Sequence, residues 1–294
     1  TDSYITTVSE NNPMNTTEMN NAARPTALIT GGSKGIGIEL AKEFARHDYY
    51  LVLVARNQAG LQRAADELKN DYDCSVTTLA LDLSEDHAPA ELFRQMQTKA
   101  IRVDVLVNNA GTGDYGPFAD SDLDRQITML RINILGLTAL TRLFLPGMIE
   151  CGHGRILNVA SVVAYFAGGP NWASYVASKH YVLAFTRGLS KELSGTGVTA
   201  TSLCPGPTAT DFVSHAGVGS ARVYRWVPKI SPSGVARAGY RAAVAGRTTV
   251  VPGLINKILA FLGELPPRAI ALIVFAFLSK GAAAPREVNL SNPN

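Results

Sequence analysis

Short runs of aliphatic and β-branched residues alternate with longer segments of helical periodicity from Thr26 onward. The apolar runs are nearly continuous, as is typical of strands buried on both faces of a parallel sheet. The expected strands are 26–30, 50–55, 75–81, 103–109, 154–161 and 198–204. The expected helices are 38–47, 58–70, 90–99, 123–149 and 172–193. This alternation predicts an α/β fold in one domain, built on a doubly wound parallel sheet.

The two ends of the chain differ from this pattern. Residues 1–24 are rich in Asn, Thr, Ser and Glu and carry no apolar run, so we expect a disordered leader without a signal peptide. The repetitive part, residues 25–249, is the predicted folded domain. Residues 250–294 form an apolar extension, which Pro266 and Pro267 divide into two helical pieces.

The second helical piece, residues 270–278, is apolar on all sides and must therefore be buried or meet lipid. Its nine residues are far fewer than the roughly 20 that span a bilayer. Three hypotheses remain: a cap over a binding site, an oligomer contact, or a helical hairpin lying in a membrane surface. We favour the first two over the third.

Composition narrows the class of protein. The chain has 294 residues and a net charge of only +3, without a run of Lys or Arg, which disfavours a nucleic-acid partner. Cys74, Cys151 and Cys204 are odd in number, far apart and set in apolar stretches, so we expect reduced, buried thiols in a cytoplasmic protein. The five histidines lack ligand spacing, and we predict no structural metal.

A glycine-rich turn follows the first expected strand. Gly31, Gly35 and Gly37 would allow a tight turn and a close approach of the backbone to a pyrophosphate, at the N-terminus of the next helix. The triplet alone is weak evidence, because many strand-to-helix turns contain glycine. Its place after the first strand predicts a Rossmann-type dinucleotide site.

The end of the second strand bears on which dinucleotide is bound. A carboxylate there would bind the ribose hydroxyls of NAD, but this strand ends in Ala55 and Arg56. Lys34 lies in the glycine turn and supplies a second cation. Two cations without a carboxylate favour the 2′-phosphate of NADP, although both side chains could be ordinary solvated charges.

Tyr175 and Lys179 lie one helical turn apart, on the stripe that faces the protein interior. A buried lysine needs a reason, because an unpaired buried ammonium is costly. An ammonium beside the phenol would lower the tyrosine pKa and make it a usable acid or base. Ser161 closes the preceding strand and could hydrogen-bond a reacting carbonyl oxygen, whereas alone it would be read as a cap.

Taken together, these motifs resemble the short-chain dehydrogenase/reductase family over about Thr26 to Asp211. The matching motifs are Thr30-Gly31-x-x-x-Gly35-x-Gly37, Asn108-Asn109-Ala110-Gly111, Asn133, Ser161, Tyr175-x-x-x-Lys179 and Pro205-Gly206. The resemblance implies that Tyr175 passes the proton, Ser161 orients the substrate oxygen, and Lys179 binds the nicotinamide ribose. It implies that Asn133 holds a water joining Lys179 to solvent.

The resemblance also implies a set of residues around the cofactor. These are Thr30, Gly31, Ser33, Lys34, Gly35, Ile36, Gly37, Arg56, Asp82, Leu83, Asn109, Ala110, Gly111, Tyr175, Lys179, Pro205, Gly206, Thr208 and Thr210. Thr208 departs from the aliphatic residue usual in the family, but the contact there is largely through backbone.

The implied activity is NADP(H)-dependent hydride transfer between nicotinamide and the carbon of a ketone or secondary alcohol, with an apolar ketone as the expected substrate. Residues 162–173 and a loop at about 207–230 are expected to shape the substrate pocket, unless their aromatic side chains only pack in the core or an interface. The resemblance implies homo-oligomers paired through the helices near 123–149 and 172–193. Two alternatives are an epimerase or dehydratase with the same Tyr-Lys pair, and a regulatory sensor that binds NADP without chemistry.

Overall fold

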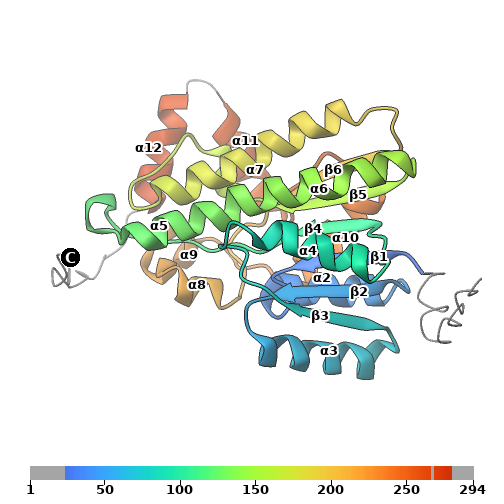
Figure 1. The fold of residues 1–294 in the computed structure, drawn as a ribbon. Coiled ribbons are helices and arrows are strands. Elements are labelled where there is room, and N and C mark those ends of the chain that lie inside the picture. The colour runs from blue at the N-terminus through green and yellow to red at the C-terminus, as the bar shows by residue number, and fades with distance from the viewer. Residues whose placement is uncertain (1–23, 266–267, 280–294) are drawn as a thin grey trace, which may run out of the picture.

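A seven-stranded parallel sheet forms the centre of the molecule in the computed structural model, which describes residues 24–265 and 268–279 (Figure 1). The strand order is β3-β2-β1-β4-β5-β6-β7. The strands are β1 (Thr26–Thr30), β2 (Tyr50–Ala55), β3 (Val76–Ala80), β4 (Val105–Asn108), β5 (Gly154–Val159), β6 (Val198–Leu203) and β7 (Thr249–Val250). The predicted doubly wound α/β fold is confirmed.

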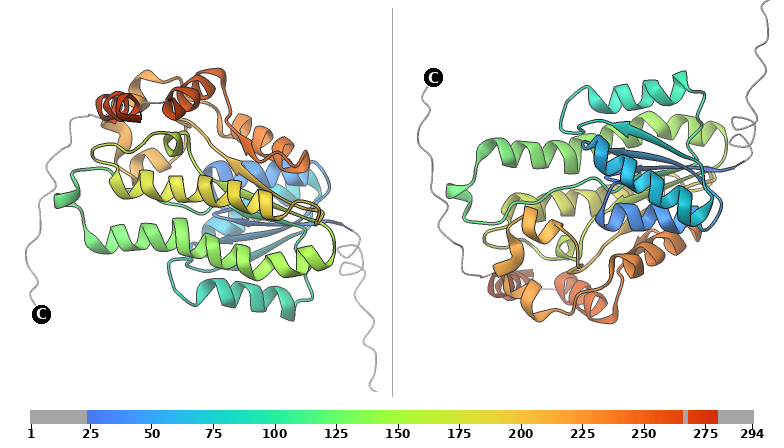
Figure 2. Two further views of the ribbon diagram at one scale, coloured as in Figure 1. Left: turned by 90° about the horizontal axis from the view of Figure 1, so that it is seen from above. Right: turned by 90° about the horizontal axis from the view of Figure 1, so that it is seen from below.

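Helices cover both faces of the sheet (Figure 2). One face carries α2 (Gly35–Ala45), α3 (Gln58–Tyr72) and α10 (Pro232–Val244). The other carries α4 (Ala88–Thr98), α6 (Leu137–Glu150) and α7 (Ala173–Glu192). Successive strand residues point to opposite faces, so Ile29 packs in the first core and Leu28 in the second. Both faces are buried, which explains why the strand sequences are continuously apolar.

The strand order places the functional edge of the sheet. β1 is hydrogen-bonded to β2 on one side and to β4 on the other. From this point the chain builds the sheet outward to β3 on one side and outward to β7 on the other. The carboxyl ends of parallel strands diverge at such a switch point and leave a crevice. The glycine turn after β1 lies at this point of the sheet.

The predicted helix over 123–149 is interrupted by a wider turn. It consists of α5 (Leu123–Leu130), a π-helical segment (Arg131–Gly136) and α6, joined without a break. Such segments change the phase of a helix and are frequent at functional sites. By length and composition this helix could cross a membrane, but it packs on the sheet as a core helix does, and we treat it as one.

Several elements escaped prediction from the sequence. α10 and β7 were not predicted, although Ser231 caps α10 by accepting a hydrogen bond from Gly234 N (3.1 Å) and Pro232 opens it. The segment after β6, expected as a loop, contains short helical turns. They are α8 (Phe212–His215), η4 (Val218–Ser220) and α9 (Arg222–Trp226).

The cysteine expectation was partly wrong. Cys74 and Cys204 are buried free thiols, but Cys151 is exposed. Cys151 follows the last residue of α6 as its C-cap, where the chain turns toward β5 at the surface. Of the apolar residues that precede it, Met148 is buried but Ile149 is exposed, so the local composition did not report burial.

The C-terminal extension forms α11 (Leu254–Glu264) and α12 (Arg268–Ser279). α11 packs closely on the domain: a Cβ built on Gly263 would lie 2.6 Å from the carbonyl oxygen of Tyr165. A Cβ on Gly206 would lie 2.1 Å from Oδ1 of Asn256, a buried side chain of α11 whose amide donates to Pro252 O (2.9 Å). Two positions thus require glycine for the extension to dock.

Candidate active site

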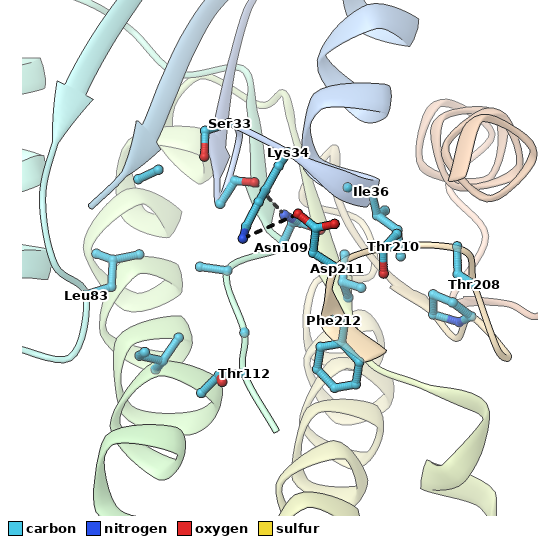
Figure 3. A pocket seen from close by; sticks show the side chains of 18 of the residues that line it. Ser33, Lys34, Ile36, Leu83, Asn109, Thr112, Thr208, Thr210, Asp211 and Phe212 are labelled. Carbon is cyan, nitrogen blue, oxygen red and sulfur yellow. Dashed lines mark hydrogen bonds and ion pairs between the residues drawn. The ribbon is translucent and has the colours of Figure 1, made fainter. Parts of the chain in front are cut away.

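A cavity of about 470 Å³ lies at the carboxyl ends of the strands, between the glycine turn and the α8 segment (Figure 3). This volume is in the range of small-molecule sites. The predicted residues that line it are Gly31, Ser33, Lys34, Gly35, Ile36, Arg56, Asp82, Leu83, Asn109, Ala110, Gly111, Ser161, Tyr175, Lys179, Pro205, Gly206, Thr208 and Thr210. Thr30, Gly37 and Asn133 lie behind its wall.

The glycine turn is shaped for close backbone contact. A Cβ on Gly37 would lie 2.1 Å from the carbonyl oxygen of Gly31, so a larger residue would push the helix from the strand. Gly31 and Gly35 have φ of 64° and 59°, in the left-handed region that favours glycine. α2 begins here without a side-chain cap and without an acidic residue in its first turn. Its N-terminal N–H groups therefore offer an anion site.

Thr30 supports the floor of the cavity rather than lining it. Its hydroxyl donates to Val107 O (3.2 Å) and accepts hydrogen bonds from the backbone N–H groups of Asn109 and Ala110 (both 3.0 Å). The side-chain Nδ2 of Asn109 donates to Thr30 O (2.9 Å) and Gly31 O (3.2 Å). These bonds join the glycine turn after β1 to the turn after β4 that contains Asn109 and Ala110. The two motifs therefore form one site.

The two predicted cations line the cavity, each near a carboxylate. Arg56 Nη1 is 3.7 Å from Asp82 Oδ2, and Lys34 Nζ is 3.7 Å from Asp211 Oδ2 (Figure 3). Asp82 also accepts hydrogen bonds from the backbone and hydroxyl of Ser84, which fix it in a turn. Both cations are solvent-exposed and loosely paired, so an incoming anion could engage them at low cost.

Tyr175 and Ser161 meet at the inner wall of the cavity. Tyr175 lies in the first turn of α7, and Ser161 follows β5, where its Oγ accepts a hydrogen bond from Val163 N (3.3 Å). Burial raises the pKa of Tyr175 well above its ordinary value, while a hydrogen bond with Ser161 acts in the opposite direction. The expected lowering of this pKa by Lys179 is wrong here, because desolvation of the phenolate dominates.

Lys179 is buried one helical turn beyond Tyr175. Its Nζ donates to Val159 O (2.9 Å) and lies 5.9 Å from the centroid of the Tyr175 ring. Burial lowers the pKa of Lys179 to about 8, and the Cys204 thiol opposes that shift. An ammonium this poorly solvated gains from any further hydrogen-bond acceptor in the cavity.

Asn133 lies in the π-helical segment, where its amide is fully engaged. Oδ1 accepts from Thr112 N (3.0 Å), while Nδ2 donates to Thr112 O (3.0 Å) and Ser178 Oγ (3.0 Å). A Cβ built on Gly111 would lie 3.2 Å from Asn133 Oδ1 and 3.4 Å from Lys179 Nζ. Asn133 thus ties the turn after β4 to α7 beside Lys179; the water that it is expected to hold remains a prediction.

Aromatic side chains back the tyrosine. The Trp172 ring meets the Tyr175 ring edge-on, with centroids 5.3 Å apart. Phe166 stacks on Phe275 of α12, with centroids 4.8 Å apart. These side chains are buried, and so is Tyr165, so the aromatic residues of 162–173 pack behind the cavity wall and connect it to the extension.

Sequence reasoning missed several residues of the site. Phe212, whose ring centroid is 5.6 Å from that of Tyr175, and Asp211 line the cavity from the segment after β6. Thr112 and Ile132 line it from the turn after β4 and the π-helical segment. Only Phe212 had a signal, as a large apolar residue within the loop at about 207–230 that was expected to shape the substrate pocket. Within the described ranges, no group of three or more His, Cys, Asp or Glu side chains is placed to hold a metal.

The cavity residues fit a nicotinamide dinucleotide. The glycine turn and the uncapped start of α2 suit a pyrophosphate, and Asp82 and Leu83 at the end of β3 border the space beside it. The opposite end, formed by Tyr175, Lys179 and Pro205-Gly206, offers hydroxyl, ammonium and backbone groups for a ribose and carboxamide. When bound, such a cofactor supplies a hydride.

Comparison with known proteins gives the family. A short chain dehydrogenase family model matches residues 25–218, and the chain belongs to this family, whose members are nicotinamide-dependent oxidoreductases. The ketoacyl reductase HetN of Nostoc sp. is 31% identical over 256 residues, which cover 83% of this chain and 86% of the relative.

Solved structures agree in fold. A short-chain dehydrogenase from Sphingobium yanoikuyae in complex with NADPH is 29% identical with a TM-score of 0.73, covering 81% of this chain and 92% of that one. Actinorhodin polyketide ketoreductase with NADPH is 28% identical with a TM-score of 0.69, covering 79% and 95%. The predicted family is confirmed.

Proposed function

We propose that this protein is an NADPH-dependent reductase of apolar ketones, with Tyr175 as the proton donor. The observation that carries the proposal is the meeting of Ser161, Tyr175 and Lys179 in a cavity that Arg56 and Lys34 also line. The substrate carbonyl would lie between the Tyr175 hydroxyl and the Ser161 hydroxyl.

The electrostatics suit proton donation. Burial raises the pKa of Tyr175, so the phenol stays protonated at neutral pH and can protonate a developing alkoxide. Ser161 donates a second hydrogen bond to the same oxygen and stabilises its charge. The Lys179 ammonium adds positive charge 5.9 Å from the phenol ring, which favours the phenolate left after proton transfer.

NADP is supported over NAD by the end of β2. Arg56 and Lys34 line the cavity, and β2 itself ends without a carboxylate. Asp82, at the end of β3, accepts two hydrogen bonds from Ser84 and faces Arg56. The two related structures named above contain NADPH, which agrees with this assignment.

An apolar substrate is supported by the walls of the cavity near Tyr175. Phe212 faces the tyrosine ring, and Ala160, the residue before Ser161, adds apolar surface. The resemblance to ketoacyl and polyketide ketoreductases points in the same direction. β-Ketoacyl thioesters and steroid-like ketones are the candidate substrates.

The test is NADPH oxidation against a carbonyl panel, with the Tyr175→Phe variant as control. Small polar ketones, short and long β-ketoacyl thioesters, steroid ketones and aromatic aldehydes cover the candidate sizes. We expect turnover to rise with apolar size in the wild type and to fall at least about 10²-fold in Tyr175→Phe, because a positioned acid contributes about that much. Affinity for NADPH should stay within about twofold.

Two results would contradict the proposal. Full turnover by Tyr175→Phe would show that another group donates the proton. Tight NADPH binding by calorimetry, without turnover of any panel member by the wild type, would favour the regulatory sensor.

A further inference from the structure

The outward face of α11 is more apolar than its buried face. The buried residues of the helix are Asn256, Ala260 and Gly263. The exposed ones are large: they are Leu254, Ile255, Ile258, Phe261 and Leu262. A helix that packs on a soluble domain normally shows the opposite pattern, with its apolar stripe turned inward. The outward stripe of α11 is therefore made to meet something apolar.

The apolar surface continues onto the neighbouring helices. α12 packs against both α11 and α9, and the Trp226 and Phe277 ring centroids are 5.8 Å apart. Of the sixteen exposed large hydrophobic side chains among the described residues, ten lie in α9, α11 and α12 or, as Leu265 does, directly after α11. We call this surface of α9, α11 and α12 the C-terminal face. Single exposed apolar side chains are normal on a soluble protein, but an apolar surface shared by neighbouring helices indicates an interaction site.

Cations border the C-terminal face. Arg222 lies over the Phe277 ring at 4.3 Å and donates from Nη1 to Phe277 O (3.3 Å), while Arg225, Lys229 and Lys257 are exposed nearby in the sequence. Residues 212–265 contain seven Lys or Arg and one acid, so their net charge is 7 − 1 = +6. Since the whole chain has +3, the remainder carries 3 − 6 = −3.

We propose that the C-terminal face docks on the surface of a lipid bilayer that contains anionic lipids. Outward Leu, Ile and Phe side chains with a Trp and a border of Lys and Arg are the composition of helices that lie in a membrane interface. The apolar side chains enter the acyl boundary, and the cations meet the headgroup phosphates.

A second copy of the chain fits this surface less well. In a two-fold interface the same patch lies on both partners, so two surfaces rich in Lys and Arg and poor in acidic side chains would be brought together. The chain also has a separate apolar surface, with Leu123, Ile127 and Leu135 exposed on α5 and the π-helical segment. Figure 2 shows α7 between that region and the C-terminal helices.

The first test uses the unmodified chain and sedimentation with vesicles. Phosphatidylcholine vesicles with and without phosphatidylglycerol distinguish lipid charge. We expect partitioning with the anionic vesicles, weakened by salt, and little with the neutral ones. The two tryptophans give a second readout, since Trp226 is 57% exposed on the C-terminal face and Trp172 is 2% exposed. Vesicles should shift the tryptophan emission to the blue, and Trp226→Phe should remove the shift while the protein still sediments.

Paired variants separate apolar and charge contributions. Ile258→Ser with Phe261→Ser should reduce partitioning at least about tenfold. Their matched control is Leu123→Ser with Leu135→Ser, two side chains of similar exposure (71% and 58%, against 50% and 64%) on the other surface. The control should partition like the wild type.

The charge pair is Arg225→Glu with Lys257→Glu. We expect it to reduce partitioning into anionic vesicles about fivefold or more for each cation replaced. Its control, Arg63→Glu with Lys69→Glu, changes the net charge equally on exposed positions of α3.

Three outcomes would overturn the proposal. One is a wild-type protein that stays in the supernatant with anionic vesicles. Another is an equal loss of partitioning in the control pairs. The third is a concentration-dependent dimer, seen by analytical ultracentrifugation and abolished by Ile258→Ser with Phe261→Ser, in a protein that ignores vesicles. Partitioning is measured without substrate, so the proposed reductase activity could fail while this proposal stands.

Discussion

At the scale of single residues, the site depends on a few side chains whose partners hold them in place. Lys179 is held by Val159 O, and Asn133 by both backbone groups of Thr112. Arg56 and Lys34 differ, because they are exposed and only loosely paired. The catalytic side chains are thus held in place before a ligand binds, while the exposed side chains of Arg56 and Lys34 can move to meet a charged ligand.

Removal of one of these cations should weaken NADPH binding selectively. We expect Arg56→Ala to lower NADPH affinity by roughly 10- to 100-fold, because a hydrogen bond to a charged group contributes about 1.5–3 kcal/mol. NADH affinity should stay nearly constant, as measured by calorimetry. Arg63→Ala, an exposed change on α3 away from the cavity, is the control. Equal losses for NADH and NADPH would contradict a role in binding a 2′-phosphate.

Most residues of the site could be predicted from the sequence because glycines, a Tyr-Lys pair and a strand-end serine are chemically distinctive. The pKa of Tyr175 could not, since its direction depends on how completely the phenol is buried. Asp211 and Thr112 also escaped prediction, because polar residues in loops carry no pattern that places them in space.

At the scale of elements, the extension is fastened to the domain by close backbone contacts. Gly263 of α11 approaches the Tyr165 backbone, and Arg187 of α7 pairs with Glu264 at 2.8 Å. Phe275 of α12 then reaches Phe166 and Trp172 behind the tyrosine. α11 and α12 therefore support the cavity wall from behind, in addition to forming the C-terminal face.

A methyl group added at Gly263 tests whether α11 is seated closely on the domain. We expect Gly263→Ala to lower the free energy of unfolding by about 1–3 kcal/mol, because its Cβ would overlap the Tyr165 carbonyl. Gly188→Ala in α7 has no atom within 4 Å of its added Cβ and should be neutral or stabilising by up to about 1 kcal/mol. Urea unfolding measures both. Equal stability of the two variants would show that α11 is not seated as described.

Apolar runs predicted β1 to β6 and helical periodicity predicted most of the long helices, whereas α10, with 13 residues, and the shortest elements were missed. β7 has only two residues and α8 four, too few for any pattern to emerge. The π-helical segment within 123–150 leaves the apolar periodicity readable as one helix. Its position follows from the Asn133 contacts with Thr112 and Ser178, which join distant parts of the chain.

At the scale of the whole molecule, two features coexist: buried groups that titrate abnormally and an uneven charge distribution. Burial lowers the pKa of Lys179 to about 8, whereas burial raises the pKa of Tyr165 and Tyr175. Residues 212–265 are strongly basic and the rest of the chain is acidic, so the net charge of +3 conceals an uneven distribution of charge along the chain.

Stability should therefore depend on pH in a definite way. Between about pH 8 and 10 the unfolded chain keeps the proton on Lys179 that the folded chain has lost, so this residue makes unfolding costlier as pH rises. Relative to Lys179→Met, the free energy of unfolding of the wild type should rise by on the order of 2 kcal/mol over that range, at up to about 1.4 kcal/mol per pH unit. Above pH 10 the raised tyrosine pKa values reverse the trend, because the unfolded chain then loses those protons first.

Denaturant unfolding of both proteins at pH 7, 8, 9 and 10 without nicotinamide gives this difference directly. The difference should level off below about pH 7, because Lys179 is then protonated in both states. A constant difference up to pH 10 would show that Lys179 keeps its proton in the folded protein.

The contact between Gly206 and Asn256 has a consequence for protein engineering. Gly206 belongs to the turn that lines the cavity together with Tyr175 and Lys179, and Asn256 belongs to the extension, yet no side chain larger than hydrogen fits between them. Chimeras that graft residues 250–279 onto a relative, or replace them with a relative's tail, would join two surfaces that have been fitted to each other. Such exchanges should succeed only when the turn after β6 is transferred together with the helices.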